Sequence, residues 1–304
     1  MQAPVKVACV QAEPVVLDRE ATLDKLAGLT AEAAGQGANL VVFPETFVSV
    51  YPSSVWARAL AGWGDPRAKS AFAVLAREAV AIPGPAADRL GEIAREHGVW
   101  LVTGVNELDP GRNGTVYNSL LYHAPDGSFA LKHRKLVPTN HERLVWGQGD
   151  GRGLRALETP IGRIGGLICW ENYMPLARFA LYESGVELYI ASTADDGDAW
   201  QATLVHIARE SRAFVIAPSH FQRAESYPSD FPLREELEGR GLLGRGGSAI
   251  LAPDGSYLAG PLYGEEGILY AELDPMRLAE ERQRFDPAGH YHRPDVLQLS
   301  VTPL

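Results

Sequence analysis

Strand-like and helix-like segments alternate along this chain, and this alternation constrains its fold more than any other feature. Residues 5–11 form a short apolar run of the kind found in buried strands. Residues 21–37 follow with a helical period that places Leu23, Leu26, Leu29 and Ala33 on one face, and another apolar run comes next. Such alternation predicts an α/β protein in which helices cover the faces of a sheet.

The same alternation continues through most of the chain. Two hairpins are expected: residues 115–124 meet residues 128–136 across a Pro-Asp-Gly turn, and residues 154–162 meet residues 163–171. The other expected helices cover residues 85–98, 174–185, 199–212 and 276–285. The other expected strands cover residues 38–46, 99–108, 186–193, 213–221, 247–252, 256–262 and 267–274.

Three segments lack a clear period. Residues 138–153 are expected to form a long loop, and residues 225–247 a polar excursion that serves as a lid or an interface loop. Residues 283–304 are expected to form an extended C-terminal tail. Because no repeat or linker divides the sequence, we expect a single domain over residues 1–304.

Charge and cysteine content narrow the class of protein. The chain has 28 Lys and Arg against 38 Asp and Glu, a formal net charge of −10, which disfavours nucleic acid and anionic membranes as partners. The N-terminus lacks a charged leader followed by an apolar core, and no apolar run is long enough to span a bilayer. The two cysteines, Cys9 and Cys169, form neither a disulfide framework nor a CxxC pair. We therefore expect a soluble, cytoplasmic protein.

Cys169 lies where an expected strand ends and an expected helix begins. At such a junction the helix N-terminus lowers the pKa of a thiol, and the next backbone N–H is placed to donate to a developing oxyanion or imidate nitrogen. These are properties of a nucleophile. The alternative interpretation is a small buried apolar residue, and Cys9, within its apolar strand, keeps that interpretation.

A nucleophilic thiol needs a proton acceptor. None of the eight histidines has an obvious orienting position, so a carboxylate is the better candidate. Glu45 follows a strongly apolar strand, at the strand end where α/β sheets place ligands. Burial there would raise its pKa and suit it to accept the thiol proton. The alternative for Glu45 is a solvated loop carboxylate.

Lysine is scarce in this sequence, with only five residues, so the two that end the first expected hairpin draw interest. Lys135 precedes an apolar Leu-Val-Pro run, where a buried ammonium would neutralise Glu45 and stabilise developing negative charge. Lys132 is expected on a solvated face. Glu142 is a candidate second carboxylate that positions Lys135 or a water, with an exposed salt-bridge residue as the alternative.

Three motifs surround these residues: FPET at Glu45, HRKLVPTNHER at Lys135 and GGLICWENYMPLAR at Cys169. Together, and in this order, they resemble the three motifs of the nitrilase superfamily of carbon–nitrogen hydrolases. The resemblance extends over residues 7–296. It implies a four-layer αββα sandwich and a catalytic set of Glu45, Lys135 and Cys169, with Glu142 as an additional carboxylate.

Within that superfamily, CWENYMPL, VWGQGDG and HYHRPDV resemble true nitrilases more than amidases, which more often follow the cysteine with a Tyr-Asp type sequence. The resemblance implies attack of the Cys169 thiolate on a small nitrile, a thioimidate, ammonia loss and an acyl enzyme. An amidase or carbamoylase using the same residues is one alternative, and a catalytically silent binding protein is another. True nitrilases commonly continue beyond the RPDV region, where this sequence nearly stops, so we expect a homodimer or small homo-oligomer.

The remaining motifs suggest no bound cofactor or metal. The GQGDGRG run lacks the strand–turn–helix context and lysine of a phosphate-binding loop. His290 and His292 lack an acidic third ligand for a metal ion. Four aromatic residues are candidates for the wall of a substrate pocket, with core packing as their alternative role: Tyr51, Trp146, Trp170 and Tyr173.

Overall fold

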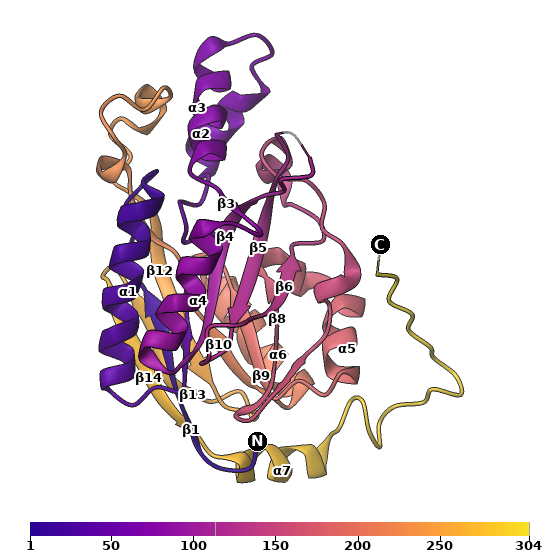
Figure 1. The fold of residues 1–304 in the computed structure, drawn as a ribbon. Helices are drawn as coiled ribbons and strands as arrows, with labels where there is room; N and C mark the ends of the chain where they lie inside the picture. Colours follow the sequence, from indigo (N-terminus) through magenta and orange to yellow (C-terminus); the bar gives the residue numbers. More distant parts are fainter. Residues whose placement is uncertain (113, 304) are drawn as a thin grey trace.

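The computed structural model describes residues 1–112 and 114–303. Within them, two seven-stranded sheets lie face to face with helices on both outer faces (Figure 1). The strand order is β14-β1-β2-β4-β5-β6 in the first sheet, with β3 beside β4. In the second sheet the order is β11-β12-β10-β9-β8-β7, with β13 beside β12. The predicted four-layer αββα sandwich is therefore confirmed.

The first sheet consists of β1 (Val5–Gln11), β2 (Leu40–Val42), β3 (Val80–Ala81), β4 (Trp100–Leu108), β5 (Val116–His123), β6 (Phe129–Arg134) and β14 (Gly267–Leu273). The second consists of β7 (Leu157–Thr159), β8 (Gly162–Ile168), β9 (Leu188–Ser192), β10 (Phe214–Ala217), β11 (Phe221–Arg223), β12 (Leu242–Leu251) and β13 (Tyr257–Tyr263). The helices are α1 (Arg19–Gly35), α2 (Ser54–Ala57), α3 (Pro66–Arg77), α4 (Pro85–His97), α5 (Pro175–Glu183), α6 (Asp198–Ser211) and α7 (Pro275–Arg284).

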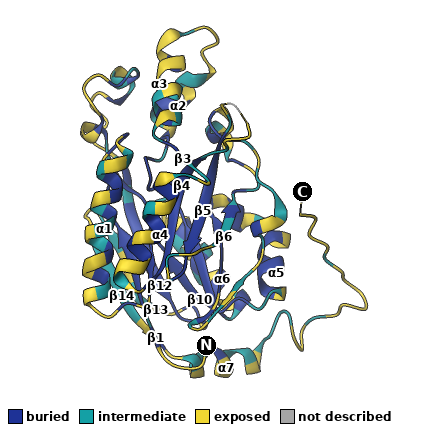
Figure 2. Cartoon of the chain, in the orientation of Figure 1, coloured by how far each residue is buried: buried dark blue, intermediate teal, exposed yellow. Residues whose placement is uncertain are grey.

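Burial explains why the sequence adopts these layers. Side chains such as Val42, Leu120, Ile190 and Phe214 pack between the two sheets, while a second apolar cluster lies under α1 and α4 and a third under α5 and α6. The central strands are therefore buried on both faces, which accounts for their nearly continuous apolar sequences. Figure 2 shows the central strands buried and exposed residues on the outer faces of the helices, whereas β13 and β14 are mostly half-buried or exposed.

Two segments differ from the sequence-based expectations. The region between β2 and β3 forms α2 and α3, which were not predicted. Residues 225–247 are less polar than expected, because Tyr227, Phe231 and Leu237 are buried in a cluster with Trp56 of α2. The Trp56 indole donates to the Tyr227 hydroxyl at 2.8 Å. Charged residues interrupt these apolar positions, so the sequence shows no helical or strand period.

Strand direction brings distant parts of the chain to one edge of the sandwich. β2 runs parallel to β1 and β4, and β8 runs parallel to β9. Carboxyl ends of parallel strands are where α/β proteins place functional groups. At the opposite end lies α7, after which the chain loops outward and returns to the body, where Thr302 lies beside Gly151 (Figure 1). Among the described residues, no helix combines the length and apolar character needed to cross a bilayer.

Candidate active site

Cys169 follows directly after β8 and begins a short 3₁₀ turn, Cys169–Tyr173, that leads into α5. Its φ of 54° lies in the left-handed region, which is strained for a residue with a side chain. The residue is only 4% exposed, yet it reaches the wall of a cavity. The sharp turn therefore presents the thiol at the edge of the sheet, as the predicted hairpin required.

Glu45 lies in the turn after β2 and is completely buried. Its Oε1 accepts hydrogen bonds from the Asn118 amide at 2.6 Å and from the Lys135 ammonium at 2.9 Å. Its Oε2 accepts one from the backbone N–H of Ala194 at 2.8 Å. Three donors from different elements thus hold both carboxylate oxygens in place, and the solvated-loop alternative for Glu45 is wrong.

The backbone of Gly104 in β4 packs directly against the backbone of the turn that holds Glu45. A β-carbon at position 104 would lie 2.1 Å from the Pro44 carbonyl oxygen, 2.5 Å from the Thr46 nitrogen and 2.8 Å from the Glu45 Cα. These distances are far below van der Waals contact. Only glycine therefore allows the strand to pass beneath this turn.

Lys135 follows β6, is 1% exposed and joins the two glutamates. Its ammonium donates to Glu45 at 2.9 Å and to Glu142 Oε2 at 2.7 Å. Glu142 also accepts from the Thr139 backbone N–H at 2.6 Å and from the Tyr51 hydroxyl at 2.8 Å. Glu142 is therefore a buried, fully engaged partner of Lys135, and its exposed salt-bridge alternative is wrong.

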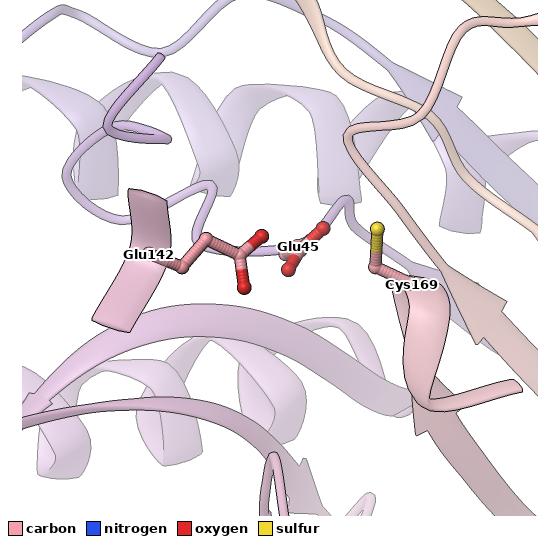
Figure 3. Close-up of side chains that lie close together, drawn as sticks. All are labelled: Glu45, Glu142 and Cys169. Atoms are coloured by element: carbon pink, nitrogen blue, oxygen red, sulfur yellow. The ribbon is translucent and has the colours of Figure 1, made fainter. Parts of the chain in front are cut away.

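The three acidic or nucleophilic side chains converge on one point. Ligand atoms of Glu45, Glu142 and Cys169 all lie within 4.8 Å of one another. Figure 3 shows the three side chains pointing toward a common space from separate segments. A thiol with two carboxylates is a possible metal-ligand set. Here, however, the Lys135 ammonium already binds both carboxylates, so the residues present do not fit a metal cation.

The electrostatics of Cys169 differ from the sequence-based expectation. Burial raises the pKa of the thiol above its ordinary value, and the nearby Glu45 carboxylate raises it further, while Lys135 opposes them. The expectation that a helix N-terminus would lower this pKa is therefore wrong. A single 3₁₀ turn precedes α5, and its effect is smaller than the cost of a buried thiolate beside a carboxylate. These surroundings favour the protonated thiol over the thiolate.

The pKa values of both Glu45 and Lys135 are raised, but for different reasons. Burial raises the pKa of Glu45, as predicted, with Lys135 opposing the shift and Glu142 adding to it. For Lys135, burial alone would lower the pKa, but Glu45, Cys169 and Glu142 together raise it above its ordinary value. The ammonium therefore remains charged, whereas the carboxylate of Glu45 is poised to accept a proton.

A cavity of about 330 Å³ opens beside the sulfur. It is lined by Tyr51, Ser54, Thr139, Asn140, His141, Glu142, Cys169, Trp170, Ala194 and Asp195. The Trp170 indole, half exposed, donates to Asp195 at 2.7 Å and forms part of the wall. Two of the four aromatic residues expected at the pocket, Tyr51 and Trp170, therefore lie there.

The other two aromatic residues lie outside the cavity lining. Trp146 is buried, its indole donates to Asn106, and its ring stands 5.8 Å from the Lys135 ammonium. It thus packs behind Lys135. Tyr173 packs edge-on against Trp170 with ring centroids 5.6 Å apart, and its hydroxyl lies 3.0 Å from Thr203. Trp146 therefore has the core-packing role that was the alternative, whereas Tyr173 is 44% exposed and packs at the surface.

Some features of the site were not recognised in the sequence. Asn118 and the backbone of Ala194 bind Glu45, but a strand asparagine and an ordinary backbone N–H carry no distinctive pattern. The expectation for Lys132 is correct only in part. Its side chain is 26% exposed, but its ammonium lies 2.5 Å from the buried carboxylate of Glu107, so it also belongs to an ion-pair network.

Comparison with known proteins agrees with this geometry. The family described as carbon-nitrogen hydrolase matches residues 6–283, and this protein belongs to that family. Among curated relatives, an aliphatic nitrilase of Sinorhizobium fredii is 45% identical over 97% of this chain and 95% of its own. Nitrilase 1 of Arabidopsis thaliana is 41% identical over 98% of this chain and 86% of its own. The predicted membership of the nitrilase superfamily is therefore confirmed.

Solved structures confirm the fold. The carbon-nitrogen hydrolase of Helicobacter pylori superposes with a TM-score of 0.75 at 21% identity, covering 96% of each chain. Saccharomyces cerevisiae Nit3, a member of the nitrilase superfamily, gives a TM-score of 0.74 at 22% identity and covers 96% of this chain and 97% of its own. At these identities the likeness concerns the fold alone.

Proposed function

We propose that this protein is a nitrilase that hydrolyses an organic nitrile to a carboxylic acid and ammonia through a covalent intermediate on Cys169. The observation that carries the proposal is the convergence of Cys169, Glu45 and Glu142 around the Lys135 ammonium beside a cavity. Support also comes from relatives that are named nitrilases and are 41–45% identical to this chain.

Glu45 is the general base of the first step. As the Cys169 sulfur bonds to the nitrile carbon, Glu45 accepts the thiol proton, and one π pair of the C≡N bond moves to nitrogen. Glu45 then returns the proton to that nitrogen, which gives a neutral thioimidate. This concerted transfer suits a thiol whose pKa is raised by burial, because a free thiolate never needs to accumulate.

Two waters complete the reaction. Glu45 deprotonates the first as it adds to the thioimidate carbon and passes that proton to the nitrogen, which gives a tetrahedral intermediate bearing OH and NH₂. Glu45 then carries the hydroxyl proton to the nitrogen, which leaves as ammonia as the C=O bond of the thioester forms. The second water attacks the resulting thioester and releases the acid and the thiol. Lys135 stabilises negative charge that develops at the reacting centre, and Glu142 acts as a positioning residue for Lys135. We propose Tyr51 and Trp170 as substrate-contacting residues because they line the cavity.

A nitrile and amide panel tests the substrate class. Ammonia release is expected from aliphatic or aromatic nitriles, with much slower release from the matched amides. An amidase or carbamoylase with the same residues would show the reverse, and turnover of amides alone would overturn the proposal. A tobacco relative, 42% identical, is named a bifunctional nitrilase/nitrile hydratase, so amide product should be measured as well.

The acid side of the pH–rate profile is expected to follow Glu45. Base catalysis needs its ionised form, and burial together with Glu142 holds its pKa above the ordinary 4.5. Turnover should therefore fall, as pH decreases, around a midpoint above 4.5. Replacing Glu142 with Gln removes a negative charge that raises this pKa, so the midpoint of kcat/KM should move to lower pH. A midpoint that stays or rises in Glu142→Gln would contradict this assignment.

Gly104→Ala is expected to damage the site through the Glu45 turn. The added methyl meets backbone atoms, so the turn must shift, and overpacking of this kind costs about 1–3 kcal/mol of stability. Misplacing Glu45 by about 1 Å should reduce kcat by about 10²-fold. Gly28→Ala in α1 is the matched control, because a β-carbon there meets no atom within 4 Å. Equal kcat in both variants would show that Gly104 does not support Glu45.

We further propose that residues 1–304 form one domain, with residues 283–304 as a tail, in a cytoplasmic homodimer or small homo-oligomer. The family match, which ends at residue 283, supports the domain boundary. The free state of Cys9 and Cys169 supports a reducing compartment. Apolar side chains exposed on helices, such as Leu176 of α5 and Met276 of α7, support association. Light scattering would measure the subunit number.

A further inference from the structure

Besides Glu45 and Glu142, a third buried carboxylate lies next to the site without reaching the cavity. Glu171 is two residues after Cys169 and 2% exposed. Its Oε1 accepts the backbone N–H of Leu136 at 2.8 Å. Its Oε2 accepts the backbone N–H of Ile168 at 2.9 Å and lies 2.9 Å from Nε2 of His133. All three partners are close in sequence to a proposed catalytic residue.

The groups around Glu171 favour its ionised form. Burial alone would raise its pKa, but His133 and the two backbone N–H groups lower it below the ordinary glutamate value. An ionised carboxylate only accepts hydrogen bonds, so Nε2 of His133 must be the donor. Hydrogen bonds to a buried charge are among the stronger ones in proteins. Glu171 therefore holds three groups together: the backbone N–H groups of Leu136 and Ile168 and the imidazole of His133.

These three hydrogen-bond donors belong to different sheets. His133 and Leu136 flank Lys135 at the end of β6 in the first sheet, and Ile168 precedes Cys169 at the end of β8 in the second. Between the sheets lies mainly apolar packing, which is not directional and does not by itself fix how one sheet edge sits against the other. Hydrogen bonds from both sheets to one carboxylate do fix the position of one sheet edge against the other.

We propose that Glu171, with His133, is a positioning residue that holds the Lys135 ammonium in register with the Cys169 sulfur across the two sheets. This inference rests on the proposed function. It assigns Glu171 no contact with substrate. Substrate binding depends on the cavity lining, to which Glu171 does not belong, so its loss should affect the chemical step and not the affinity.

Glu171→Gln is the direct test, because it keeps the size of the side chain but puts an NH₂ group against an N–H donor and removes the charge. We expect kcat for the best nitrile to fall by about 10²-fold, with KM changed by no more than about threefold. Glu187→Gln is the matched control. Glu187 is also buried and also accepts the N–H of a β8 residue, Arg163, but at the opposite end of that strand. This control should keep its kcat even if its melting temperature falls equally.

A pair of His133 variants keeps the proposal testable if Glu171→Gln does not fold. His133→Gln retains a donor and should keep most of kcat, whereas His133→Leu lacks one and should lose about tenfold or more. Unchanged kcat in Glu171→Gln, or equal kcat in the two His133 variants, would overturn the positioning role. Failure of the proposed function looks different, because the wild-type protein itself would then release no ammonia from nitriles.

Discussion

Cys169→Ala is expected to lose nitrile turnover by about 10⁴-fold or more while remaining folded. The sulfur forms the covalent bond in the proposed mechanism, and no other side chain on the cavity wall replaces it as a nucleophile activated by Glu45. The fold should tolerate the change because only one sulfur atom is removed from a site that already borders a cavity. Ammonia release at saturating nitrile measures the loss, and circular dichroism measures the fold.

Cys9→Ala is the matched control for that variant. Cys9 is the other free cysteine, completely buried in β1 between the sheets, and it does not line the cavity. Its replacement removes an equal volume from the core but should leave kcat near the wild-type value. The nucleophile assignment fails if Cys169→Ala retains wild-type turnover, or if Cys9→Ala loses as much activity as Cys169→Ala.

Lys135→Met is expected to reduce both turnover and stability. The ammonium is the common donor of Glu45 and Glu142, so its loss leaves two buried carboxylates facing each other without a cation. Breaking a buried ion pair from one side costs about 3–5 kcal/mol, although protonation of one carboxylate would relieve part of it. Loss of charge stabilisation at the reacting centre should reduce kcat by about 10²–10³-fold. Urea denaturation and ammonia release measure the two effects.

Lys132→Met is the matched control for Lys135→Met, because it removes another lysine that binds a buried carboxylate. Lys132 also binds a buried carboxylate, Glu107, but Arg134 binds the same carboxylate and remains after the change. Lys132 does not line the cavity. This variant should therefore lose less stability and keep its kcat. Wild-type turnover in Lys135→Met would contradict the proposed role of the ammonium.

The fold was largely predictable because its signals are local. The apolar runs at β1, β4 and β9 and the helical period of α1 and α6 lie within single segments, and the Pro-Asp-Gly turn marks the hairpin of β5 and β6. α2 was missed because it is only four residues long and packs against distant residues, as the hydrogen bond between Trp56 and Tyr227 illustrates. α3 has local signals that were overlooked: Asp65 caps a helix that begins at Pro66, and its buried residues Ala68, Ala71 and Leu75 have helical spacing.

The site was predictable in its residues and less so in its electrostatics. Glu45, Lys135, Glu142 and Cys169 lie together as the three motifs implied. The pKa of Cys169 was expected to be low and is raised, because burial and a facing carboxylate depend on tertiary packing that no local motif reveals. Glu171 escaped notice for a related reason: its partners His133 and Leu136 are more than 30 residues away.

Rapid-quench mass spectrometry of the intact protein during nitrile turnover tests the central claim most directly. We expect a transient population heavier by the mass of the nitrile or of its acyl group, mapped to Cys169 by peptide digestion and absent in Cys169→Ala. The Glu45→Gln variant should form this adduct more slowly, because its side chain accepts no proton. Ammonia release by the wild-type protein with no adduct at any quench time, or an adduct that persists in Cys169→Ala, would contradict the mechanism.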